Sequence, residues 1–110
     1  LPNLRRASAG KVAIISSQMG STTRAPGGSY IYRASKSAVL NLGRNLATDL
    51  AQQGIAVGVY HPGWVQTDMG GPSAPTTVAE STRGLFAILD GLKPEHNGRF
   101  FNFDGTELPW

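Results

Sequence analysis

Tyr32 and Lys36 lie four residues apart in the pentapeptide Tyr-Arg-Ala-Ser-Lys, and their spacing indicates an acid–base site. On an α-helix, side chains four positions apart share one face, so the ammonium group lies beside the phenol. A free tyrosine has a pKa of about 10, and a neighbouring cation favours its phenolate form. Such a pair can give a proton to a carbonyl oxygen or take one from an alcohol.

Three segments are predicted to bring polar groups to one place. The apolar, β-branched run over residues 11–16 predicts a strand buried on both faces, and it leads into Ser17. Residues 55–60 predict a second buried strand, and a long loop over 61–75 with three prolines and three glycines follows it. Ligands bind at the carboxyl ends of parallel strands, so Ser17, Tyr32 and this loop are expected to share one edge of a sheet.

The remaining elements alternate between helix and strand. After a loop over 18–29, a helix is predicted over 30–53, with an apolar series at near-helical spacing formed by Ala34, Ala38, Leu42, Leu46 and Leu50. Thr77 and Glu80 fit a capping box that opens a second helix, which ends at Gly91. Residues 99–103 predict a last strand, whereas the first ten residues show no helix or strand pattern. This order predicts an α/β fold with a parallel sheet and right-handed crossovers.

Composition narrows the classes of function. The chain has 110 residues, of which 40% are hydrophobic, as expected for one globular domain. Its net charge is +3, but the basic residues form no stripe with interleaved aromatic residues, so nucleic-acid binding is not expected. No apolar run of about 18 residues and no secretory signal are present, which makes a cytoplasmic location the default expectation. The absence of cysteine excludes disulfide and thiolate chemistry.

Taken in order, the motifs resemble the C-terminal half of a short-chain dehydrogenase/reductase of the single-domain type. Before the Tyr32–Lys36 pentapeptide stands Ile-Ile-Ser-Ser-x-x-Gly over 14–20, and after it stands His-Pro-Gly-Trp-Val-Gln-Thr-Asp-Met over 61–69. The ending over 102–110 is similar to that of the sniffer-like and C-factor-like carbonyl reductases in this family. The resemblance covers residues 11–110 and implies half of a Rossmann-type doubly wound parallel sheet.

The resemblance also implies roles for individual residues. Ser17 would orient and polarise the substrate carbonyl, with Ser16 as the neighbouring candidate, while Tyr32 would exchange the proton. Lys36 would assist Tyr32 and bind the nicotinamide ribose. The implied cofactor-binding residues are Tyr32, Lys36, Pro62, Gly63, Val65 and Thr67. The implied substrate-lining residues are Ser17, Met19, Trp64 and Met69. The implied cofactor is NADP, with NAD as an alternative, and no metal is implied. The implied partners are a small carbonyl or alcohol substrate and a second copy of the chain, which would bind through the 30–53 helix.

The chain shows no glycine-rich G-x-G-x-x-G turn after a strand, although this family binds its dinucleotide through such a turn. Residues 1–110 are therefore expected to be a single partial domain, the C-terminal half of a dinucleotide-binding reductase domain, without the N-terminal cofactor half. Such a fragment is expected to be inactive alone, whereas its parent would be an NAD(P)-dependent carbonyl reductase.

Other interpretations stay open from the sequence. The segment can be a non-catalytic signalling or oligomerisation module, or part of an epimerase or dehydratase that shares the Tyr–Lys pair. Ser17 can bond its own backbone, and Thr67 and Asp68 can simply cap a short helix. His61 has no triad partner in the sequence and is interpreted as a strand-end residue, and His96 has no assigned role.

Overall fold

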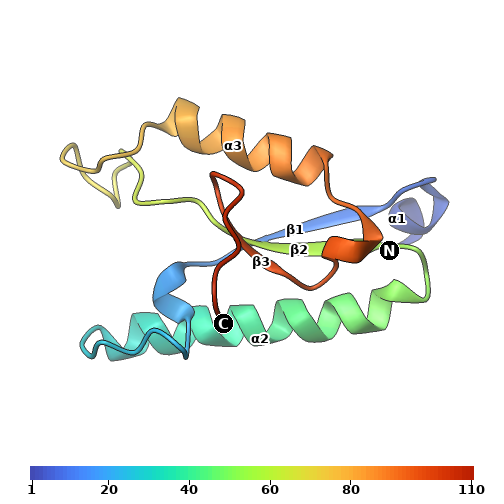
Figure 1. The fold of residues 1–110 in the computed structure, drawn as a ribbon, viewed down its shortest axis with the longest axis horizontal. Helices are drawn as coiled ribbons and strands as arrows, with labels where there is room; N and C mark the ends of the chain where they lie inside the picture. The colour runs from blue at the N-terminus through green and yellow to red at the C-terminus, as the bar shows by residue number, and fades with distance from the viewer.

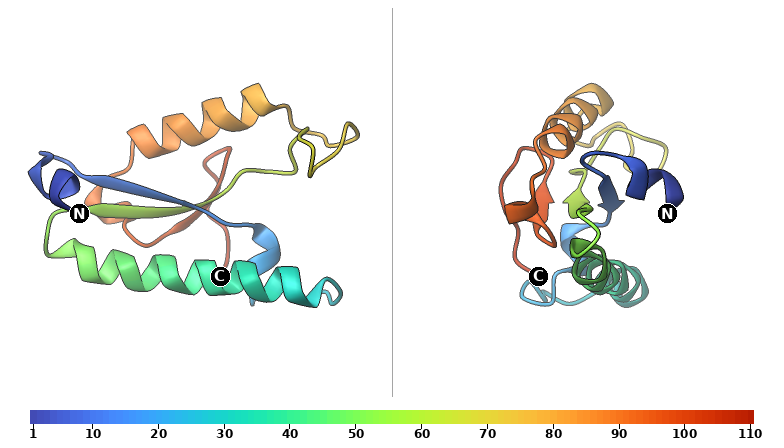
Figure 2. Two further views of the ribbon diagram at one scale, coloured as in Figure 1. Left: turned by 180° about the vertical axis from the view of Figure 1, so that it is seen from behind. Right: turned by 90° about the vertical axis from the view of Figure 1, so that its right-hand side faces the viewer.

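A three-stranded parallel sheet lies between two helices (Figure 1). The computed structural model describes residues 1–110. In order of pairing, the strands are β1 (Lys11–Ile15), β2 (Ala56–His61) and β3 (Phe100–Asn102). Helix α2 (Tyr30–Ala51) covers one face and α3 (Val78–Asp90) lies over the other, so the chain forms three layers (Figure 2). The predicted α/β fold with alternating helices and parallel strands is confirmed.

Three short helices complete the chain, and they are α1 (Pro2–Arg6), η1 (Gln18–Gly20) and η2 (Pro94–His96). The prediction that the first ten residues contain no helix is wrong. Helix α1 begins with Pro2, whose fixed φ angle suits the first turn of a helix and whose missing N–H is not needed there. None of the helices is both long and apolar enough to cross a membrane.

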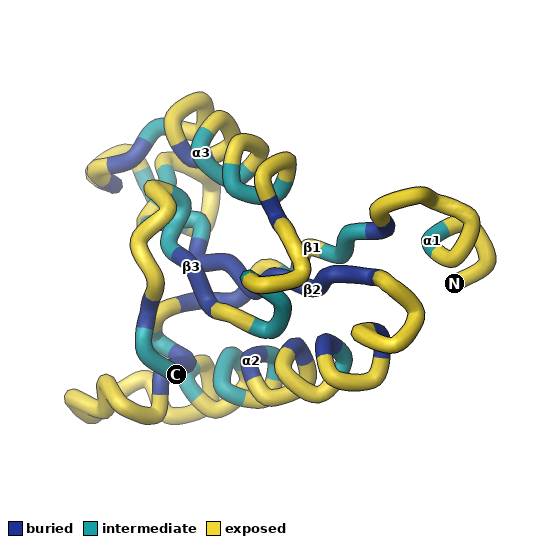
Figure 3. The backbone as a smooth tube through the Cα atoms, turned by 45° about the vertical axis from the view of Figure 1, so that its right-hand side comes forward, coloured by how far each residue is buried: buried dark blue, intermediate teal, exposed yellow.

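Strand β2 is the centre of the core, as predicted for a buried strand. All six of its residues are buried, and the side chains of Val57 and Val59 are fully enclosed. Val59 packs with Leu40 of α2, and with Phe100 of β3, on the side of the sheet that α2 covers. Figure 3 shows this pattern, with β2 buried and the outer side of α2 exposed. Pairing on both edges and helices on both faces account for the burial of β2.

Strand β1 differs from the prediction that it is buried on both faces. Val12 and Ile14 pack toward α2, but Ala13 is exposed and Ile15 is 49% exposed. The strand lies at the edge of the sheet, and α3 lies above β2 and β3 instead of above β1 (Figure 2). One face of β1 therefore carries apolar side chains that nothing in residues 1–110 covers.

The buried stripe of α2 also differs from the predicted one. The residues that face the sheet are Leu40, Gly43, Ala47 and Leu50, whereas Ala34, Ala38 and Leu42 are exposed. A strict four-residue spacing advances about 400° per step and so drifts about 40° around the helix each time. Alternating steps of three and four residues keep one face toward the sheet. Only Leu50 belongs to both the predicted series and the buried stripe.

The predicted capping box at the start of α3 is confirmed. The Thr77 hydroxyl accepts a hydrogen bond from the Glu80 N–H at 3.2 Å, and a Glu80 carboxylate oxygen accepts one from the Thr77 N–H at 2.8 Å. These two bonds satisfy backbone donors that the first turn of a helix cannot pair. Helix α3 ends at Gly91, as predicted.

We predict that Thr77→Ala lowers the free energy of unfolding by about 1 kcal/mol, because the cap is lost. Two hydrogen bonds to the Glu80 carboxylate lower its pKa below the ordinary value of 4.5. The larger effect comes from the Thr77 N–H and the smaller one from the Thr77 hydroxyl. The stabilisation from Glu80 is therefore present above pH 4.5 and is lost as the pH falls through the lowered pKa. Urea unfolding at neutral and acid pH checks this: the difference between wild type and Thr77→Ala must shrink in acid by the part due to the bond from the Thr77 hydroxyl to the Glu80 carboxylate, since Thr77→Ala keeps the N–H bond.

Candidate active site

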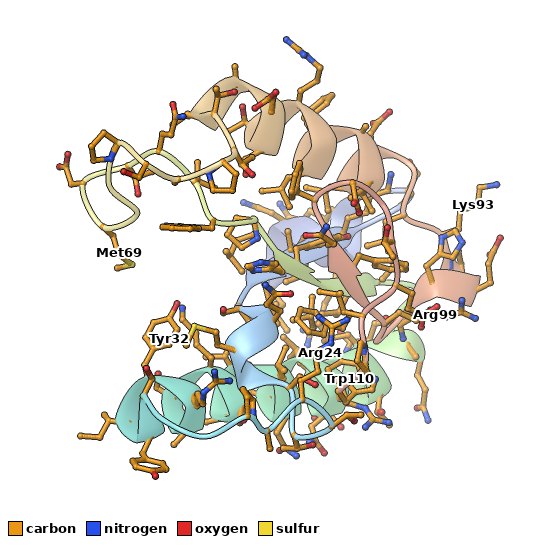
Figure 4. All side chains as sticks on the ribbon, turned by 60° about the vertical axis from the view of Figure 1, so that its left-hand side comes forward. Arg24, Tyr32, Met69, Lys93, Arg99 and Trp110 are labelled. Atoms are coloured by element: carbon orange, nitrogen blue, oxygen red, sulfur yellow. The ribbon has the colours of Figure 1, made fainter.

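The carboxyl ends of β1 and β2 open into a cleft of about 730 Å³ that is lined by 17 residues. The lining comes from η1, the start of α2, the loop over 62–77 and the first turns of α3. Figure 4 shows Tyr32 at the start of α2 and Met69 on the loop, on opposite sides of the opening. The cleft thus lies at the edge that the positions of the two strands predicted.

Tyr32 and Lys36 lie next to each other on the first turns of α2, as the spacing predicts. The Lys36 Nζ atom is 5.6 Å from the centroid of the Tyr32 ring, within the range of a cation–π contact. Tyr32 lines the cleft and is 39% exposed, whereas Lys36 is half-buried and is absent from the cleft lining. A substrate in the cleft can therefore reach Tyr32, with the ammonium group near its ring but outside the cleft lining.

Ser16 and Ser17 differ in how their hydroxyl groups are used. The Ser16 hydroxyl donates to the Lys36 carbonyl oxygen at 3.0 Å, so its hydrogen is already committed. The Ser17 hydroxyl oxygen instead accepts a bond from the Met19 N–H at 3.1 Å, which caps η1. The local backbone bond expected for Ser17 is therefore present, yet it leaves the hydroxyl hydrogen for a ligand. Of the two serines, Ser17 is the better donor to a molecule in the cleft.

Close packing of η1 against α2 fixes Met19 and Ser17 relative to Tyr32. A Cβ atom on Gly20 would lie 2.6 Å from the Lys36 carbonyl carbon, so only glycine allows this approach. The Arg33 guanidinium donates to the Met19 carbonyl oxygen at 3.2 Å and to the Gly28 carbonyl oxygen at 3.1 Å. Arg33, for which no role was predicted, thus ties the wall of the cleft to the helix that carries Tyr32.

The loop after β2 is held in shape mainly by its own hydrogen bonds. The Trp64 indole N–H donates to the Gly70 carbonyl oxygen at 2.8 Å, and the Thr67 hydroxyl accepts from the Gly70 N–H at 3.0 Å. Thr67 thereby closes a turn, and no helix follows it, so the alternative interpretation of Thr67 and Asp68 as the cap of a short helix is wrong. Gly63 has a φ angle of +88°, and a Cβ atom there would lie 2.9 Å from the Phe103 ring. The bend at Pro62 therefore requires glycine at the next position.

The predicted site residues gather in this cleft with one exception. Its lining includes Ser16, Ser17, Met19, Tyr32, Pro62, Gly63, Trp64, Val65, Thr67 and Met69, and it leaves out Lys36. One group was missed: Val78, Ser81, Thr82 and Leu85 of α3 also line the cleft. Their spacing of three, four and seven residues places them on one face of a helix, but the spacing alone does not show that this face turns toward the cleft. Buried Ser81 donates to the Pro62 carbonyl oxygen at 2.6 Å and joins α3 to the loop.

His61 is another cleft residue for which no role was predicted. It is the last residue of β2, as interpreted, but it is only 7% exposed and lines the cleft. Burial, and then the positive charge of Arg24, lower the pKa of His61 from its ordinary value of 6.5. The imidazole is therefore neutral at pH 7.

Sequence comparison identifies the class of protein. The profile of the short chain dehydrogenase family matches residues 1–77. The chain therefore belongs to the short-chain dehydrogenase family, as its motifs predicted. A relative from Myxococcus xanthus, called C-signal, is 49% identical over 111 aligned residues, which cover 100% of this chain and 67% of the relative.

Solved structures show the same relationship. The carbonyl reductase Sniffer of D. melanogaster matches with a TM-score of 0.86 and 44% identity, over 91% of this chain and 41% of that one. An NADPH-bound carbonyl reductase from chicken fatty liver matches with a TM-score of 0.90 and 33% identity, over 99% of this chain and 49% of that one. The chain thus spans less than half the length of these two structures and about two thirds of C-signal.

Proposed function

We propose that residues 1–110 are the catalytic half of an NAD(P)-dependent carbonyl reductase, which converts a small aldehyde or ketone to an alcohol. The observation that carries this proposal is the placement of Ser17 and Tyr32 in one cleft, with the Lys36 ammonium 5.6 Å from the Tyr32 ring centroid. Membership of the short-chain dehydrogenase family and the likeness to two carbonyl reductases support it.

Each catalytic residue has a distinct part in this proposal. The Ser17 hydroxyl donates a hydrogen bond to the substrate carbonyl oxygen and fixes its position. Tyr32 gives its phenolic proton to the same oxygen as the alcohol forms, and the Lys36 ammonium stabilises the phenolate that remains. The nicotinamide, when bound, supplies the hydride for the carbonyl carbon. In the reverse direction, Tyr32 takes the proton of the alcohol.

The loop after β2 is proposed to hold the cofactor and the substrate. Pro62 and Gly63, with the backbone of Val65 and the hydroxyl of Thr67, would bind the nicotinamide end of NADP, and Tyr32 and Lys36 would bind its ribose. A cleft of about 730 Å³ falls in the size range of small-molecule sites, so the space suits such a group. Met19, Trp64 and Met69 would border the substrate. Trp64 and Met69 are 57% and 88% exposed, so a bound substrate would give them an apolar neighbour.

The proposal includes a further half of the domain, outside residues 1–110, that binds the rest of the dinucleotide. Two observations support it: the chain spans less than half of the carbonyl reductases that it matches, and one face of β1 carries exposed Ala13 and Ile15. Such a half would cover that apolar face and extend the sheet.

Replacement of Lys36 tests the chemistry. In the full-length protein that contains residues 1–110, Lys36→Met is expected to lower kcat for NADPH-dependent aldehyde reduction about 100-fold, because the Tyr32 phenolate loses its stabilising cation. Lys93→Met is the matched control, since Lys93 lies beside η2 and does not line the cleft. Equal kcat values for the two variants would contradict the role of Lys36.

A second candidate function follows from the outer surface of α2. Tyr30, Ile31 and Leu42 are 80%, 88% and 58% exposed, which leaves an apolar surface for a second copy of the chain or another protein. An oligomerisation or signalling role would use this surface and would not need the reduction of a carbonyl in the cleft. If Lys36→Met keeps both the oligomeric state and a biological effect of the wild type while turnover is lost, the non-catalytic role is favoured.

A further inference from the structure

His61 lines the cleft and has a ring nitrogen without a hydrogen-bond partner. The side chain is 7% exposed, and its Nδ1 atom is buried without a hydrogen-bond partner. Buried polar atoms are nearly always paired in folded proteins, so the His61 ring lacks the hydrogen bonds that normally fix a buried histidine. The imidazole lines the same cleft as Ser17 and Tyr32, so a ligand held by these two residues would share the cleft with His61.

The serine hydroxyl groups at this end of the sheet do not bond His61, and the hydroxyl hydrogen of Ser17 stays free for a ligand. Ser16 directly follows β1, and His61 is the last residue of the neighbouring strand β2. The Ser16 hydroxyl donates its hydrogen to the Lys36 carbonyl oxygen. The Ser17 hydroxyl accepts from the Met19 N–H, and the buried Ser21 hydroxyl donates to the Trp110 carbonyl oxygen. The fold therefore fixes these hydroxyl groups without pairing the imidazole nitrogen.

A neutral imidazole has one nitrogen that donates and one that accepts. Burial and the charge of Arg24 lower the pKa of His61 and keep the ring in this neutral form. An amide carries both a donor and an acceptor, and so does a hydroxyl, so either group complements the ring in whichever tautomer it adopts. Nδ1 is enclosed by the protein, whereas Nε2 keeps some exposure and makes no hydrogen bond within residues 1–110, so a molecule in the cleft meets the ring at Nε2.

We propose that His61 is a specificity-determining residue of the cleft, whose imidazole hydrogen-bonds an amide or hydroxyl group of the molecule bound beside Ser17 and Tyr32. The inference rests on the proposed reductase function and adds to it a ligand contact that Ser17, Tyr32 and Lys36 do not provide. Two molecules can supply this chemistry: the nicotinamide, through its carboxamide, and the carbonyl substrate, through a further polar group.

The first test is the NMR spectrum of the histidine rings in the full-length protein with ¹⁵N-labelled histidine. NADP⁺ is added first and p-hydroxybenzaldehyde second. A change in the His61 ring nitrogen shifts at the first addition assigns the contact to the coenzyme, and a change only at the second assigns it to the substrate. His96 lies at η2, away from the cleft, and is the internal control. Saturating binding of both molecules with no change at His61 would overturn the proposal.

Substitution of His61 gives a second, independent test of the proposed ligand contact. His61→Leu is expected to raise either the Kd for NADP⁺ or the KM for p-hydroxybenzaldehyde about fivefold to tenfold, the effect of one lost hydrogen bond, with kcat within about twofold. His61→Asn, which keeps a donor and an acceptor, should recover most of the loss, and His96→Leu should leave both constants unchanged. Wild-type Kd and KM values in His61→Leu would also overturn the proposal.

These outcomes separate the inference from the proposed function. Full activity of Tyr32→Phe would refute the reductase assignment, whereas the NMR response of His61 to NADP⁺ does not depend on turnover. The NMR test uses the wild-type protein, so it decides the question even if His61→Leu fails to fold.

Discussion

Tyr32→Phe in the full-length protein is expected to lower kcat for carbonyl reduction about 1,000-fold, while the Kd for NADPH stays within about threefold. The substitution removes only the phenolic hydroxyl and keeps the ring that Lys36 approaches to 5.6 Å. Without that hydroxyl, the cleft loses the group proposed to give the substrate oxygen its proton. The decrease in NADPH absorbance during turnover measures kcat, and fluorescence titration measures the Kd.

Tyr30→Phe is the matched control for this prediction. Tyr30 lies two residues earlier on α2, is 80% exposed and does not line the cleft, so the same loss of a hydroxyl should leave kcat unchanged. If Tyr32→Phe retains the activity of Tyr30→Phe, the proposed proton donor is wrong. A large rise in the Kd for NADPH would instead mean that the Tyr32 hydroxyl acts mainly through its proposed contact with the ribose.

Phe100→Ala is expected to lower the free energy of unfolding by about 3–5 kcal/mol, the range for removing a large buried aromatic side chain. Phe100 is fully buried on β3, where it packs with Leu40 and Val59, and its ring centroid is 5.7 Å from that of Trp110. The substitution would leave a cavity between the sheet and α2, next to the strand that ends in the cleft. Urea unfolding of the full-length protein, followed by circular dichroism, measures the loss.

Phe86→Ala is the control for the cavity. Phe86 lies on α3 and is 71% exposed, so the same truncation there should change the free energy of unfolding by less than about 0.5 kcal/mol. A loss below about 1 kcal/mol for Phe100→Ala would mean that the site relaxes around the cavity or is not part of the core.

The parts of the fold that depend on neighbours in the sequence could be predicted. The capping box of Thr77 and Glu80 and the stop at Gly91 are local hydrogen-bond patterns, so their spacing was sufficient. The edge position of β1 and its open face could not be predicted, because burial depends on which elements lie alongside the strand. The face of α2 was misassigned because small residues, Gly43 and Ala47, fill the contact with the sheet in place of larger apolar ones.

The candidate site, too, could be predicted from the sequence only in part. Ser17, Tyr32 and the loop after β2 were placed at one edge because strand ends in a parallel sheet meet there. The face of α3 that lines the cleft depends on how that helix docks, which its spacing does not specify. The burial of His61 depends on the packing of three segments around the end of β2, and a lone histidine gives no sign of that in a sequence.

The most direct test is to measure NADPH consumption together with alcohol formation by the full-length protein, with p-hydroxybenzaldehyde as the substrate. If the cleft of Ser17 and Tyr32 is the catalytic half of a carbonyl reductase, one alcohol forms for each NADPH oxidised, and Tyr32→Phe abolishes both signals while NADPH still binds. Alcohol formation by Tyr32→Phe at the wild-type rate would contradict the assignment and show that the cleft does not use this tyrosine as its acid.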